Sequence, residues 1–94
     1  MEKRVGSVLI IVTEKEHVSK LHTVLSQHGD IIVGRMGLNL GLENAQVISL
    51  VVHGDTDRIA SLTGKIGKIK GFEVKSVLSK YVEDDGVDNE VTEH

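Results

Sequence analysis

The chain has 94 residues, a formal net charge of −3 and no cysteine. A chain of this length forms one domain, because so small a core cannot be divided into two that fold independently. The lack of cysteine excludes disulfides, thiolate metal sites, iron–sulfur ligation and cysteine nucleophiles. The negative net charge lacks the basic footprint that phosphate-backbone binding needs, so we expect no direct contact with nucleic acid.

The longest apolar run, Val8 to Val12, is far too short to cross a bilayer. The residues before it, Met1-Glu2-Lys3-Arg4, contain no apolar segment of the signal-peptide type. We therefore predict a cytoplasmic protein without a membrane partner.

The beginning of the chain predicts a strand followed by a helix. Residues 4–12 are rich in β-branched side chains and end at a polar cluster in which Thr13 and Glu16 have the spacing of a capping box. Apolar residues then recur at helical spacing until Gly29, which stands where a left-handed residue would end the helix.

The remainder repeats this pattern after a second strand. Residues 31–38 and 45–52 predict two strands joined by a polar, glycine-containing connection, which is typical of a hairpin. Asp55 or Thr56 then suits the N-cap of a second helix, whose apolar residues recur at three- and four-residue spacing. Residues 72–78 predict the last strand.

The resulting order is strand, helix, strand, strand, helix, strand, and its halves resemble each other at an offset of about 41 residues. This order predicts an α+β ferredoxin-like βαββαβ fold, with a four-stranded antiparallel sheet and both helices on one face. We assign residues 1–80 to this domain. Residues 81–94 are acidic and unpatterned, so we expect a disordered tail.

The two strands expected at the centre of the sheet are apolar on both faces, namely Val8 to Val12 and Val47 to Val52. A sheet with one solvated face would alternate apolar and polar residues instead. Since the helices cover one face only, we predict that a second copy of the sheet covers the other, in a homodimer or a tetramer. A face that tolerates exposed valines is the alternative.

The chain shows no sign of catalysis. It has no nucleophile elbow, and no histidine is spaced with a serine and an acid in a recognisable order. We therefore expect that the protein is not an enzyme, and the sequence identifies no cofactor.

Several stretches resemble a known family over roughly residues 1–80. They are Arg35-Met36-Gly37-Leu38, Leu62-Thr63-Gly64-Lys65-Ile66-Gly67 and Gly71-Phe72-Glu73-Val74. In these stretches the chain resembles the iron-only hydrogenase system regulators. The resemblance implies an ACT-like ferredoxin fold, similar also to the C-terminal sensing domain of nickel-responsive repressors, and a regulatory role.

The leading hypothesis is a non-catalytic, oligomeric regulatory domain that acts through a small ligand or a protein partner. We expect a ligand at the subunit interface, near the turn after the first strand, the hairpin and the turn at residues 53–57. Arg35, Asn39 and Glu43 are the candidate ligand-binding residues, although such residues are also common in ordinary hairpins.

The rival hypothesis is a metal-binding sensor or chaperone. His53 ends a central strand just before a helix N-terminus, where α/β proteins often collect ligands. With Asp55 and Asp57 it offers nitrogen and oxygen ligands for a metal ion, whereas a histidine that faces solvent is the ordinary alternative.

Overall fold

The computed structural model describes residues 2–39 and 46–84. In chain order its elements are β1 (Glu2–Val12), a 3₁₀ turn η1 (Lys15–His17), α1 (Val18–Gln27), β2 (Ile32–Asn39), β3 (Gln46–Asp55), α2 (Thr56–Gly67) and β4 (Phe72–Asp84). Across the described residues, neither helix has the length and apolar character needed to span a membrane.

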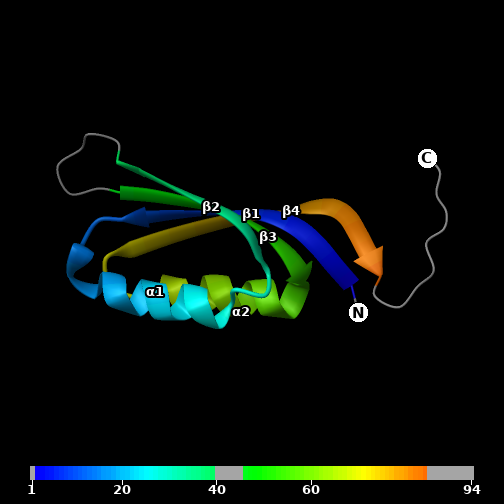
Figure 1. Ribbon diagram of the computed structural model, residues 1–94, viewed down its shortest axis with the longest axis horizontal. Coiled ribbons are helices and arrows are strands. Elements are labelled where there is room, and N and C mark those ends of the chain that lie inside the picture. Colours follow the sequence, from blue (N-terminus) through cyan, green and yellow to red (C-terminus); the bar gives the residue numbers. More distant parts are fainter. Residues whose placement is uncertain (1, 40–45, 85–94) are drawn as a thin grey trace.

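The four strands form one antiparallel sheet in the order β2-β3-β1-β4, with β2 and β4 at its edges. Both α1 and α2 lie on the same face of this sheet (Figure 1). The predicted α+β ferredoxin-like βαββαβ topology is therefore confirmed, and β1 and β3 are the central strands, as the sequence predicts.

The core lies between the helices and the central strands. Val8, Ile10 and Val12 of β1 are fully buried. On β3, Leu50 and Ile48, the partners of Val8 and Ile10, extend the same apolar layer. The helices complete it with side chains at helical spacing, as expected for two amphipathic helices. These are Leu21 and Leu25 of α1 and Ile59, Leu62 and Ile66 of α2.

The two helices begin differently. The N-cap of α2 is Asp55, whose Oδ1 accepts a hydrogen bond from the backbone N–H of Arg58 at 2.9 Å. The capping box predicted for α1 does not form, because the hydroxyl of Thr13 instead donates to the carbonyl of Gly71 at 3.0 Å. α1 is preceded by η1, and its N-cap, His17, makes no side-chain hydrogen bond to the helix.

The last strand is longer than the sequence pattern indicates. We expected the domain to end at residue 80, but β4 continues to Asp84. The extension is held by pairing with the start of β1, where Arg4 lies opposite Val82, beyond an irregularity in the register. Residues 85–94 of the expected tail lie outside the described part of the chain.

Candidate functional site

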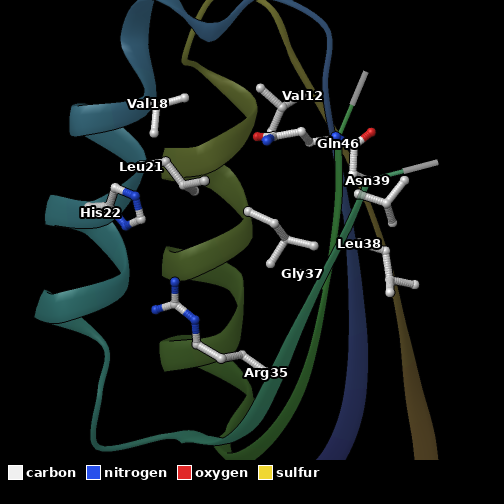
Figure 2. Close-up of a pocket in the computed structure, with 11 residues that line it drawn as sticks. Val12, Val18, Leu21, His22, Arg35, Gly37, Leu38, Asn39 and Gln46 are labelled. Carbon is white, nitrogen blue, oxygen red and sulfur yellow. The ribbon is translucent and has the colours of Figure 1, made fainter. Parts of the chain in front are cut away.

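A cleft of about 300 Å³ lies between α1 and β2 on the helix side of the sheet. β2 is an edge strand, and on its helix side it presents Arg35, Gly37 and Asn39 here and no large apolar side chain that would fill the gap. The register places Arg35 opposite Leu50 and Gly37 opposite Ile48, both on the face toward the helices. Figure 2 shows the side chains around this space.

The cleft has an apolar wall and polar ends. Val18 and Leu21 of α1 form part of the wall, while Asn39 and Gln46 stand at one end of the space (Figure 2). Arg35 extends from β2 toward the helices (Figure 2). An apolar enclosure with a few polar groups is the usual composition of a small-molecule site.

Two of the three predicted ligand-binding residues, Arg35 and Asn39, line this one cleft. The third, Glu43, lies outside the described residues. Sequence reasoning did not propose Gly37 or His22 as ligand-binding residues, although both also line the cleft. A glycine inside a strand often marks a place where a ligand or another backbone approaches closely, so Gly37 could have been selected from the sequence.

The structure separates the predicted ligand segments into two groups. Val12 pairs with Gln46, so the turn after β1 lies at the same end of the sheet as the β2–β3 connection. Lys3 pairs with Asp55, which places the 53–57 turn at the other end. A ten-residue strand spans about 30 Å, so the three segments do not meet at one site within a single chain.

The three residues proposed for a metal site are not gathered around one point, and one of them already caps a helix. The carboxylate of Asp55 caps α2, and His53 stands on β3 opposite Val5 of β1. Asp57 is in the first turn of α2. Over residues 2–39 and 46–84, no group of three or more histidine, cysteine, aspartate or glutamate side chains has an arrangement that could hold a metal ion.

A polar junction ties the end of α1 to α2. His28, fully buried, has Nδ1 2.8 Å from the carbonyl of Val24 and Nε2 3.2 Å from Oγ of Ser61. Beside it, Arg58 donates to the carboxylate of Asp30, which holds the pKa of that carboxyl below its ordinary value. This junction holds the fold together and does not face the cleft.

The face of the sheet away from the helices, which we call the open face, is covered by no described helix (Figure 1). Along each strand its side chains alternate with those of the core. It comprises Ser7, Leu9 and Ile11 of β1, Met36 and Leu38 of β2, Val47, Ser49 and Val51 of β3, and Glu73, Lys75 and Val77 of β4.

Comparison with known proteins identifies relatives. A family model described as "TM1266-like: Iron-only hydrogenase system regulator, putative" matches residues 4–76. The solved structure of the uncharacterized protein TM1266 from Thermotoga maritima is 34% identical to the chain, with a TM-score of 0.78. That match covers 83% of this chain and 99% of the other. Comparison with curated proteins gives no match.

Two more solved structures are similar at low identity. The C-terminal domain of the MgtC protein from Mycobacterium tuberculosis is 10% identical, with a TM-score of 0.64 over 85% of this chain and 92% of the other. The de novo designed protein Foldit4 is 13% identical, with a TM-score of 0.53 over 84% and 98% of the two chains. These two likenesses show the fold alone.

Proposed function

Because the chain belongs to the TM1266-like family, whose description is that of an iron-only hydrogenase system regulator, we propose that it is a non-catalytic, cytoplasmic regulatory module that works as a homodimer. The observation that carries the proposal is the open face, whose apolar side chains no described element covers.

The open face exposes more large apolar groups than a solvated sheet face normally carries. Leu9 and Val51, on the two central strands, are 40% and 46% exposed, and Val77 on β4 is 71% exposed. A shallow, almost entirely apolar depression of about 320 Å³ lies between Val51 and Val77. Contiguous apolar surface of this kind marks an interaction site on a soluble protein.

The size of the open face suits a dimer. Four strands of roughly eight residues, spaced about 4.8 Å apart, cover about 500 Å² in projection, and upright side chains add to this area. Stable interfaces begin at about 600 Å² from each partner. The open face therefore has nearly the whole area that one copy must supply.

The charges favour a second copy of the chain as the occupant. Among the residues that define the open face, one is acidic and one is basic, Glu73 and Lys75, both on β4. A two-fold axis brings the same patch of two copies together, so each carboxylate can lie near the ammonium group of the partner. A face without net charge does not select a strongly charged partner instead.

Sedimentation velocity of the full chain at micromolar concentration tests this proposal. We expect a mass of twice the 10.2 kDa chain, or a tetramer built from such dimers. Val51→Lys puts an ammonium group in the middle of the open face and should halve the mass of the assembly. Ala60→Lys adds the same group on the exposed side of α2 and should leave the mass unchanged.

Circular dichroism of both variants shows whether each one folds. A wild-type chain that sediments as a monomer contradicts the homodimer. A folded Val51→Lys variant that keeps the wild-type mass contradicts the placement of the interface on the open face.

A further inference from the structure

The cleft between α1 and β2 lies on the opposite side of the sheet from the open face. A second copy seated on the open face leaves this cleft accessible. The helix-side groups that line it, among them Arg35, Gly37 and Leu21, all belong to one chain, so binding there needs no second copy and goes beyond the proposed function.

The cleft contains one guanidinium group, that of Arg35. Arg35 makes no hydrogen bond or ion pair with another residue of the described part of the chain, and no aspartate or glutamate of that part lines the cleft. A guanidinium presents a planar fork of N–H donors that matches a carboxylate with two parallel hydrogen bonds. Arg35 thus offers the cleft a receptor for a monoanion.

The rest of the cleft favours an organic body. Leu21 is fully buried, and Val18 and Ile48 pack partly exposed against the same core. The volume of about 300 Å³ is at the small end of ligand sites, which range from about 300 to 1,000 Å³. A compact aliphatic or aromatic group fits this space, whereas inorganic phosphate would leave the apolar wall without a partner.

Gly37 keeps the space open. Its position in the register, between Arg35 and Asn39, directs any side chain there toward the helices. A Cβ added at Gly37 would meet no atom within 4 Å, so the cleft begins directly at the backbone. The same strand carries a matched glycine on the opposite face, Gly34, which also has nothing within 4 Å.

From this geometry we propose that the α1–β2 cleft binds a small organic monocarboxylate. The guanidinium of Arg35 receives the carboxylate, and the apolar body lies against Leu21 and Val18. Binding requires the absence of a side chain at Gly37. The acid bound in the cleft would then be the ligand that the proposed regulatory module senses.

The test is titration of the isotope-labelled full chain with butyrate, isovalerate, hexanoate and phenylacetate, followed by ¹H–¹⁵N correlation spectra. We expect at least one acid to shift amide signals of α1 and β2. Isovaleramide, which has the shape of isovalerate without its charge, and inorganic phosphate should each bind at least about tenfold more weakly than the best acid.

Two variants with matched controls locate the site. Arg35→Gln should weaken binding at least about tenfold, since hydrogen bonds to a charged group contribute most. Gly37→Val should abolish binding by filling the cleft. Lys20→Gln removes a cation from α1 that does not line the cleft, and Gly34→Val places the same bulk on the other face of β2. Both control variants should bind as the wild type does.

The spectra also show whether each variant keeps the fold, which separates lost binding from lost structure. The proposal is overturned if no acid of the series binds, if the amide or phosphate binds as well as the acids, or if folded Gly37→Val binds normally. The mass of the assembly is measured separately, so a monomeric chain that binds isovalerate contradicts the homodimer alone.

Discussion

The buried imidazole of His28 joins the two helices by a hydrogen bond to Ser61, with Nε2 and Oγ 3.2 Å apart. The other ring nitrogen, Nδ1, lies 2.8 Å from the carbonyl of Val24. A carbonyl can only accept, so Nδ1 carries the proton and donates. In the neutral ring Nε2 therefore accepts from the hydroxyl of Ser61, and both nitrogens are satisfied.

Replacement of Ser61 by alanine should destabilise the protein by about 1–3 kcal/mol, because it leaves the buried Nε2 without a donor. The free energy of unfolding by urea, from the midpoint and the slope of the transition, measures this loss. Thr63→Ala is the control, since it removes an exposed hydroxyl of the same helix that donates to the carbonyl of Ala60, one turn back. Equal stability of Ser61→Ala and wild type would contradict the role of the His28 junction.

Gly71→Ala should destabilise the protein by about 1–3 kcal/mol, the usual cost of a strained backbone position. Gly71 has a φ of +86°, which side chains disfavour, and an added Cβ would clash with the side chain of Glu14. Its carbonyl also accepts from Thr13, so a shift of the backbone would disturb the turn after β1. Thermal unfolding of the purified variant measures the loss.

The matched control is Gly64→Ala, within α2. An added Cβ there meets nothing within 4 Å, and alanine is favoured over glycine in a helix. This change should stabilise the protein by about 0.5–1 kcal/mol. Opposite signs for the two glycine substitutions are therefore expected, and the same sign would contradict the assignment of strain to Gly71.

Asp30→Asn should lower stability at neutral pH and make it less sensitive to acid. The hydrogen bond from Arg58 lowers the pKa of Asp30 below its ordinary value of 3.8. The unfolded chain then binds the proton more readily, so the stabilising contribution is complete above this ordinary value and is lost as the pH falls through the folded pKa. Because Asp30 is exposed, the effect is small.

Urea unfolding of wild type and Asp30→Asn at a series of pH values measures this dependence. The two stabilities should converge in acid. In an Arg58→Gln background the same substitution should have a clearly smaller effect on stability, because the largest cause of the lowered pKa is gone. An undiminished difference there would assign the effect to another partner of Asp30.

The order of strands and helices could be predicted because each element carries its own apolar period. The details that could not be predicted depend on contacts between distant residues. Thr13 has the spacing of a cap, yet its hydroxyl bonds to Gly71, which lies far along the chain. Gly29 was expected to be left-handed, but among the described residues only Gly71 has a positive φ. The extension of β4 beyond residue 80 likewise depends on its pairing with β1.

The candidate site was predictable only in part. Arg35 and Asn39 were selected from the sequence, and the alternation of β2 places both on the helix side, where they line one cleft. Their separation from the 53–57 turn follows from the register of β1 and β3, which no local pattern encodes. The cleft itself arises because Gly37 lacks a side chain opposite Ile48.

The position of β1 between β3 and β4 has a consequence for how the chain folds. Both partners of this apolar strand follow it in the sequence, so its pairing must close long loops, and such topologies fold more slowly than helical bundles. At about 5–20 residues per second, a ribosome needs roughly 3–12 s to proceed from the end of β1 to the start of β4. During synthesis β1 is therefore complete for several seconds before β4, its last partner strand, is made. A chaperone that shields Val8 to Val12 in that interval would raise the yield of folded protein.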